Sequence, residues 1–278
     1  MKPAVFILES VSKPASAKQK SEPKPVQPLP LRSAILLFAV PAALTFLSFH
    51  LFRPWLETLG YSPLKSFLGA LTVPVALLFA AALVAYNKVE NQPLQWDAFA
   101  ERMRFPRLQL KDVLLGIGLF VAASVGYAIF SRLAITLIDA GLIQLPANLP
   151  TLVDPRASLT LESLDRSAGG ILRGQWDLLL LYLVAFFFNI VGEELWWRGY
   201  ILPRQELRHG KWTWLLHGTL WTLFHFFKWW DLIGLLPVCL VLSFAAQRLR
   251  NNWPVLIAHA LINGLSVLAV AAGVAGML

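Results

Sequence analysis

Long apolar segments recur along the chain, and they limit its fold more than any other feature. A helix needs about 20 predominantly apolar residues to cross a bilayer. The chain is 57% hydrophobic and 14% charged, with a mean hydropathy of +0.60, whereas soluble domains carry about 25% charged residues. The pattern predicts an all-α, polytopic transmembrane helical bundle with about seven spans. The expected spans lie near residues 33–52, 66–86, 112–131, 177–200, 212–229, 232–247 and 253–276.

The distribution of lysine and arginine predicts how the bundle is oriented. With the N-terminus placed in the cytoplasm, the inside segments hold 17 of the 24 basic residues and the outside segments hold 7. Basic residues gather in cytoplasmic loops of membrane proteins. We therefore expect a cytoplasmic N-terminus, an outside C-terminus and an integral protein of the plasma (inner) membrane.

Composition along the chain predicts three regions. Residues 1–30 combine lysines and prolines and are expected to form a disordered basic tail. Residues 31–176 hold the first membrane helices and two hydrophilic loops, at 87–111 and 143–176. Residues 177–278 hold the remaining spans and the polar motifs described below, and form the predicted catalytic region.

The formal net charge of +8 has two interpretations, contact with nucleic acid or contact with lipid. Because the basic residues lie in loops between apolar spans, we interpret them as orientation signals and contacts with anionic headgroups. The lipid bilayer is therefore an expected partner and nucleic acid is not. The single cysteine, Cys239, lies in an apolar segment and is expected to serve packing.

Two adjacent glutamates, Glu193 and Glu194, lie near the end of a predicted span, with Arg198 four residues further on. Carboxylates at membrane depth are costly and are usually functional. Adjacent helix residues point about 100° apart, so we expect Glu194 to pair with Arg198 while Glu193 faces a cavity as a general base. The alternative is a purely structural ion pair at the helix end.

Two further polar groups lie on later spans. His225 follows Trp221 by one helical turn, and Asn263 follows His259 by one turn. Taken alone, His225 is most simply a packed histidine, and His259 with Asn263 a polar clasp between helices. A shared polar cavity, expected to open to the cytoplasmic side, would satisfy all three groups at once. One difficulty is depth, because His225 lies about 13 residues, or roughly 20 Å, from the inside end of its span.

The ordered motifs resemble those of the CAAX prenyl protease 2 family, also called CPBP or Abi intramembrane proteases. The family pattern is EExxxR, then FxxxH, then HxxxN or HxxxD. This chain has Glu193, Glu194 and Arg198 for the first motif. It has Trp221 and His225 for the second, with Trp221 at the usual phenylalanine position, and His259 and Asn263 for the third. The resemblance covers residues 177–270, about a third of the chain.

The resemblance implies a role for each matching residue. Glu193 and His225 would activate water, while His259 and Asn263 would stabilise the oxyanion. Glu194 and Arg198 would support the site, and Trp221 would form a wall of the substrate cavity. No cofactor is the preferred prediction, so that the enzyme would be a glutamate-type protease. Zinc stays an alternative, because Glu193, His225 and His259 are of the types that bind zinc.

Three functions compete at this stage. The first is an intramembrane endopeptidase that hydrolyses a peptide bond in a membrane-anchored or lipidated, CAAX-type substrate. The second is a non-catalytic membrane scaffold or a bacteriocin-immunity-type protein with the same fold. The third is an ion-coupled transporter, against which the lack of an evident internal repeat argues. We favour the endopeptidase.

Overall fold

The computed structural model describes residues 24–146, 149–158 and 160–277. Most of the predicted tail, residues 1–30, lies outside these ranges. Within them every regular element is helical, which confirms the all-α prediction. The elements are α1 (Leu31–Leu47), η1 (Ser48–Phe52), α2 (Arg53–Thr58), α3 (Pro63–Val84), η2 (Ala85–Val89), α4 (Trp96–Arg102), α5 (Leu110–Asp139), η3 (Thr151–Val153), α6 (Leu161–Ala168), α7 (Trp176–Phe187), η4 (Phe188–Gly192), η5 (Glu194–Ile201), α8 (Leu202–His209), η6 (Gly210–Trp212), α9 (Thr213–Phe224), η7 (His225–Asp231), α10 (Leu232–Leu249) and α11 (Trp253–Ala275).

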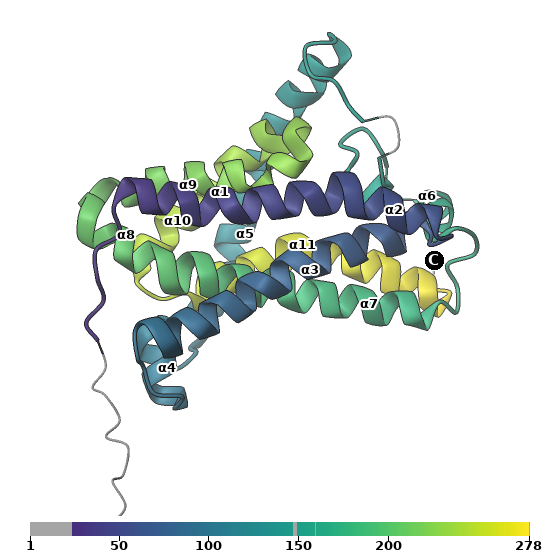
Figure 1. Cartoon of the computed structure of the whole chain (residues 1–278). Coiled ribbons are helices and arrows are strands. Elements are labelled where there is room, and N and C mark those ends of the chain that lie inside the picture. The colour runs from purple at the N-terminus through teal and green to yellow at the C-terminus, as the bar shows by residue number, and fades with distance from the viewer. Residues whose placement is uncertain (1–23, 147–148, 159, 278) are drawn as a thin grey trace, which may run out of the picture.

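Five helical segments of the described chain are long and apolar enough to cross a membrane. Four of them each contain one predicted span. The fifth, Trp176–Leu249, contains three predicted spans, because short π and 3₁₀ turns join its helices without a break. The count of seven and the cytoplasmic opening of the cavity stay predictions. The start of α1 and the C-terminus lie at opposite ends of the bundle (Figure 1).

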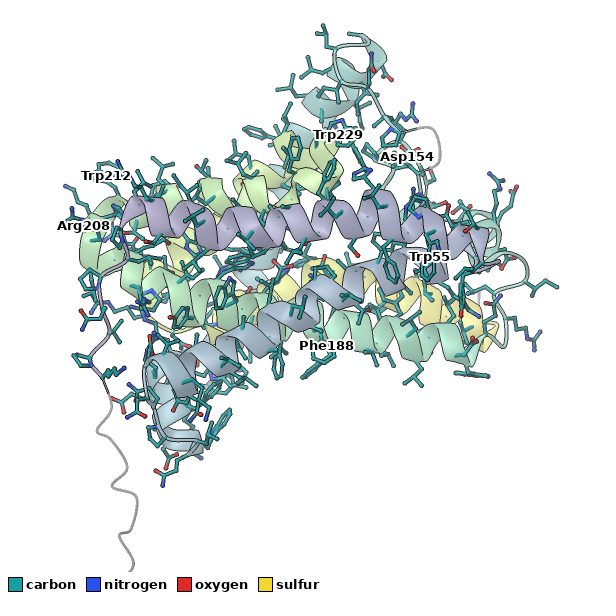
Figure 2. All side chains as sticks on the ribbon, viewed as in Figure 1. Trp55, Asp154, Phe188, Arg208, Trp212 and Trp229 are labelled. Carbon is teal, nitrogen blue, oxygen red and sulfur yellow. The ribbon has the colours of Figure 1, made fainter. Side chains whose placement is uncertain are left out.

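The outer surface of the bundle suits a lipid environment. Large apolar side chains such as Leu36, Leu77 and Leu268 are 62%, 52% and 67% exposed. The indoles of Trp55 and Trp212 are also exposed, and they lie near opposite ends of the bundle (Figure 2). Tryptophan is enriched where a membrane protein meets the two interfaces. These observations describe an integral membrane protein.

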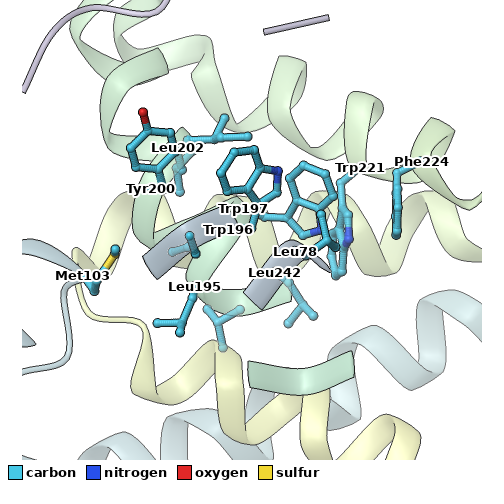
Figure 3. Close-up of a cluster of buried hydrophobic side chains, with 14 of the residues drawn as sticks. Leu78, Met103, Leu195, Trp196, Trp197, Tyr200, Leu202, Trp221, Phe224 and Leu242 are labelled. Atoms are coloured by element: carbon cyan, nitrogen blue, oxygen red, sulfur yellow. The ribbon is translucent and has the colours of Figure 1, made fainter. Parts of the chain in front are cut away.

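The core beside the glutamates is largely aromatic (Figure 3). Trp197 is fully buried and stacks on Phe38 of α1, with ring centroids 4.3 Å apart. Trp221 and Phe224 of α9 are each 2% exposed and belong to the same cluster. Large, rigid rings fix the spacing of neighbouring helices, so this cluster sets how η5, α1 and α9 approach each other.

The loop between α3 and α5 packs into the bundle and supports η5. Arg102 at the end of α4 donates to both carboxylate oxygens of Glu90, over 2.7 and 2.6 Å. The same guanidinium donates to the Gly199 carbonyl over 2.8 Å. Met103, which is fully buried, accepts a hydrogen bond at its carbonyl from Asn252, directly before α11. The loop therefore connects the helix of Glu193 and Glu194 with the start of the helix of His259.

Gly192 allows η4 to approach α3 closely. A Cβ atom at this position would lie 2.6 Å from the Val75 carbonyl oxygen and 3.3 Å from Phe79 Cβ. Backbone atoms cannot rotate away, so Gly192→Ala must separate the helices. Overpacking of this kind costs about 1–3 kcal/mol. We expect a lower melting temperature in mild detergent, followed by tryptophan fluorescence.

Gly118→Ala is the matched control for this prediction. Gly118 lies within helix α5, and an added Cβ there would have no neighbour within 4 Å. Alanine is the better helix former, so we expect this variant to keep or slightly raise the melting temperature. Equal melting temperatures for the two variants would show that the contact between η4 and α3 is not tight.

Candidate functional site

Glu193 is held in place by three side-chain donors. It is 1% exposed. Its Oε1 accepts from Asn189 Nδ2 over 2.6 Å, and its Oε2 accepts from the indole nitrogens of Trp197 and Trp221 over 3.2 and 2.8 Å. Each carboxylate oxygen has two acceptor positions. Oε1 therefore keeps one position for a further donor, such as a water molecule.

Glu194 points in another direction and links two helices, as its position next to Glu193 predicts. Its Oε1 lies 2.8 Å from His259 Nδ1 of α11. Arg198 Nη1 lies 3.0 Å from the same oxygen, so the two charges pair, although their alignment is not that of a hydrogen bond. Both side chains are fully buried, and the Arg198 guanidinium lies 3.4 Å from the centre of the Trp221 ring. The predicted pair of Glu194 and Arg198 is confirmed.

His225 lies where α9 ends. Its Nδ1 is 2.9 Å from the Trp221 carbonyl oxygen. A carbonyl can only accept, so Nδ1 carries the proton of this hydrogen bond. In the neutral ring Nε2 then has a free lone pair, and Nε2 makes no hydrogen bond to the described protein. His225 is therefore arranged to accept a proton or a hydrogen bond from a molecule in the adjoining space.

The polar side chains form two levels along the helices. Glu193, Trp221 and His259 lie at the first level: Trp221 donates to Glu193, and its ring centroid is 5.5 Å from that of His259. The second level is one helical turn away, with Asn189 four residues before Glu193, and His225 and Asn263 four residues after Trp221 and His259. Asn263 Nδ2 donates to Asn189 Oδ1 over 3.2 Å, which connects α11 with η4. Asn263 keeps a second N–H for another acceptor.

All four predicted catalytic residues line one cavity of about 140 Å³. They are Glu193, His225, His259 and Asn263. The depth of His225 in its span therefore does not keep it from the other groups, because α9 runs beside the glutamates and His225 is only one turn beyond Trp221. Trp221 itself does not line this cavity. It lies behind Glu193 and serves as a hydrogen-bond donor to the carboxylate.

The structure adds lining residues that the sequence motifs do not contain. Asn189 contacts both Glu193 and Asn263, and Tyr182 donates to Ser266 Oγ over 2.7 Å at the other end of the cavity. Asn189 is four residues before Glu193, so the i, i+4 spacing of polar residues was a usable signal for it. No sequence signal identifies Tyr182 or Ser266, because they meet only through the packing of α7 on α11.

The glutamates also lie in an unusual helical segment. Both η4 and η5 are π-helical, so their backbone hydrogen bonds skip one more residue than in an α-helix. Such segments are rare and occur frequently at functional sites. The wider π-helical turn changes which face of the helix each side chain occupies. The sequence alone did not predict this π-helical segment.

The arrangement of the possible ligands bears on the zinc alternative. Among the described residues, no group of three or more histidine, cysteine, aspartate or glutamate side chains is arranged to hold a metal ion. Glu193, His225 and His259 thus line a common cavity without converging as ligands of one ion.

Comparison with protein families gives one match for this region. Residues 175–265 match the family described as type II CAAX prenyl endopeptidase Rce1-like. The match begins just before α7 and ends within α11, so it includes every residue of the three motifs. Comparisons with curated proteins and with solved structures give no significant match.

Proposed function

We propose that the chain is an intramembrane endopeptidase of the glutamate type. The premise is that residues 175–265 form a region of the type II CAAX prenyl endopeptidase family. The observation that carries this proposal is the shared cavity. Glu193, His225, His259 and Asn263 come from three helices and line one space of about 140 Å³. Such a space holds roughly five water molecules, enough for an attacking water and the reacting peptide group.

The acceptors of the cavity activate the water. Glu193 Oε1 and His225 Nε2 each have a free acceptor position, as derived above. A water molecule between them gives its proton to the Glu193 carboxylate while its oxygen attacks the peptide carbonyl carbon. The proton then passes to the leaving nitrogen as the C–N bond breaks. General base and acid catalysis of this kind contributes about 10²–10⁴-fold to a rate.

The donors of the cavity stabilise the oxyanion. Asn263 has one N–H left for the carbonyl oxygen of the substrate. His259 donates from Nε2 when both of its ring nitrogens carry protons, and Glu194 Oε1, 2.8 Å from Nδ1, is the partner for such an imidazolium ring. Fixed donors aimed at developing negative charge supply a large part of catalysis in hydrolytic enzymes.

A neighbouring apolar hollow suits the anchor of the substrate. It lies between α1 and α9 and has a volume of about 530 Å³. Its lining is apolar throughout, and Phe224 forms a wall both of this hollow and of the catalytic cavity. We assign the hollow to the lipid or apolar segment that anchors the substrate, because an anchor placed there brings the attached peptide to Glu193.

Peptide cleavage by the purified full-length chain tests the proposed function. Membrane peptides of one sequence, with and without a prenyl group, are incubated with the protein in vesicles, and the products are identified by mass spectrometry. We expect cleavage, faster for the prenylated peptide, and we expect it to persist after treatment with a chelator. Loss of cleavage with the chelator and recovery with zinc would overturn the metal-free mechanism, and no cleavage of any peptide would argue against the enzyme.

A further inference from the structure

One lysine lies in the wall of the catalytic cavity, and the motifs do not account for it. Among the described residues that line the cavity, Lys228 is the one lysine or arginine. Its side chain is 18% exposed. In the sequence it lies at the end of the predicted span 212–229 and outside the three motifs. A cation in the wall of a small cavity that also contains a general base requires an explanation in terms of the substrate.

Lys228 is held by a partner that is itself fixed from another helix. Its Nζ donates to Asp231 Oδ2 over 2.9 Å, and Asp231 Oδ1 accepts from Tyr127 of α5 over 2.9 Å. Asp231 is 8% exposed. An ammonium group has three N–H donors, so two remain for a ligand. The carboxylate orients the lysine without using its full hydrogen-bonding capacity.

The backbone brings Lys228 to the cavity. It lies in η7, three residues after His225, and its φ of −128° and ψ of 61° interrupt the helix there. Three residues of 3₁₀ helix rise about 6 Å, and an extended peptide advances by roughly 3.3–3.6 Å per residue. If Lys228 holds one group of a bound peptide, a peptide bond only a few residues away from that group therefore lies beside His225.

The charges of the cavity indicate the chemical class of the ligand. Glu193 lines the cavity together with His225, and its carboxylate repels an anion at that position. Lys228 provides the complementary position for an anion. A peptide that enters this small space with its end first carries one obligatory anion, the free C-terminal carboxylate.

We propose that Lys228 binds the C-terminal carboxylate of the substrate and so directs cleavage to a bond a few residues before the C-terminus. The assignment rests on the proposed endopeptidase function. Lys228 is then a specificity residue that recognises the C-terminal end of the substrate, whereas the four catalytic residues act on the peptide bond.

The test compares peptides that differ only at their C-terminus. One ends in a free carboxylate and one in a carboxamide. A third is a carboxamide whose last residue is glutamate, which distinguishes the terminal carboxylate from an acidic side chain. We expect the wild-type protein to prefer the free acid over the plain amide by roughly 10–100-fold in kcat/KM, as for a hydrogen bond to a charged group.

Variants assign this preference to Lys228. Lys228→Met combined with Asp231→Asn removes both charges, so no unpaired carboxylate is left buried, and we expect the ratio of acid to amide to fall to about one. Lys228→Arg should keep most of the ratio. Lys65→Met is the matched control, because Lys65 also pairs with an aspartate, Asp177 at 2.6 Å, but does not line the cavity. It should keep the full ratio.

Three results would overturn the proposal. The first is equal cleavage of acid and amide by the wild type, and the second is a preference that survives in the Lys228 double variant. The third is a glutamate-ended amide that is cleaved as well as the free acid, because Lys228 would then recognise an acidic side chain and not the terminal carboxylate.

A binding measurement separates this proposal from the proposed function. Fluorescent acid and amide peptides are titrated onto the Glu193→Gln protein, which is expected to cleave them about 10²–10⁴-fold more slowly, and anisotropy is followed. A preference for the acid that the Lys228 double variant abolishes would support carboxylate binding even if the wild type cleaves nothing. Equal binding of both peptides would contradict it even if the wild type is an active protease.

Discussion

Glu193→Gln is expected to lower kcat/KM for peptide cleavage by about 10²–10⁴-fold, the contribution of a general base. Glutamine preserves the size of the side chain, and its amide oxygen can still accept from the Trp197 and Trp221 indoles that now donate to Oε2. What is lost is the carboxylate that takes the proton of the attacking water. The melting temperature should change much less than the rate, because two of the three donors keep a partner.

The measurement is the initial rate of cleavage of the best peptide from the panel, with melting temperature recorded in parallel. Glu162→Gln is the matched control, since Glu162 is an exposed glutamate in α6 whose side chain is 85% exposed and pairs with Arg166. It should leave the rate unchanged. Wild-type activity in a folded Glu193→Gln protein would remove Glu193 from the mechanism and with it the glutamate-type assignment.

Glu194→Gln is expected to destabilise the fold by about 3–5 kcal/mol, the cost of removing one partner of a buried ion pair. Arg198 would keep its charge at zero exposure, with the Trp221 ring at 3.4 Å as its remaining close partner. A loss of this size in a chain of this length lowers the melting temperature by on the order of 10 °C. Activity should fall as well, because His259 loses the carboxylate 2.8 Å from its Nδ1.

Tryptophan fluorescence during heating in mild detergent measures this effect. Exposed ion pairs contribute little, so the same Glu162→Gln control should unfold like the wild type. Adding Arg198→Met to Glu194→Gln removes the uncompensated charge and should recover part of the lost stability, which a double-mutant cycle quantifies. A melting temperature of the single variant equal to that of the control would show that the buried pair does not stabilise the fold.

Both predictions depend on a site that the sequence located in outline. The motif spacing placed Glu193, His225, His259 and Asn263 on three helices, and the structure places all four in the wall of one cavity. It also predicted the pairing of Glu194 with Arg198, because residues four apart share a helix face. Trp221 was expected as a wall of the cavity, whereas the structure places its ring over Arg198 and its N–H on Glu193.

Helix boundaries were predictable where local chemistry sets them. The last predicted span begins at residue 253, and α11 begins at Trp253 with Pro254 in its first turn, where proline fits a helix. The π-helical turns of η4 and η5 were not predictable, because the contacts that stabilise them come from elsewhere in the chain. The hydrogen bond from Arg102 to the Gly199 carbonyl joins residues 97 positions apart.

From the sequence alone, an integral membrane bundle of helices could be predicted, together with polar motifs that resemble those of CAAX proteases. Hydropathy and i, i+4 spacing are local properties, and they fix which segments enter the bilayer and which polar groups share a helix face. What surrounds these groups depends on how the helices pack, as for the Trp221 indole that donates to Glu193 and the lysine in the wall of the cavity. These surroundings depend on contacts between residues far apart in the sequence, 28 positions for Trp221 and Glu193 and 104 positions for Tyr127 and Asp231, and the packing of the helices decides them.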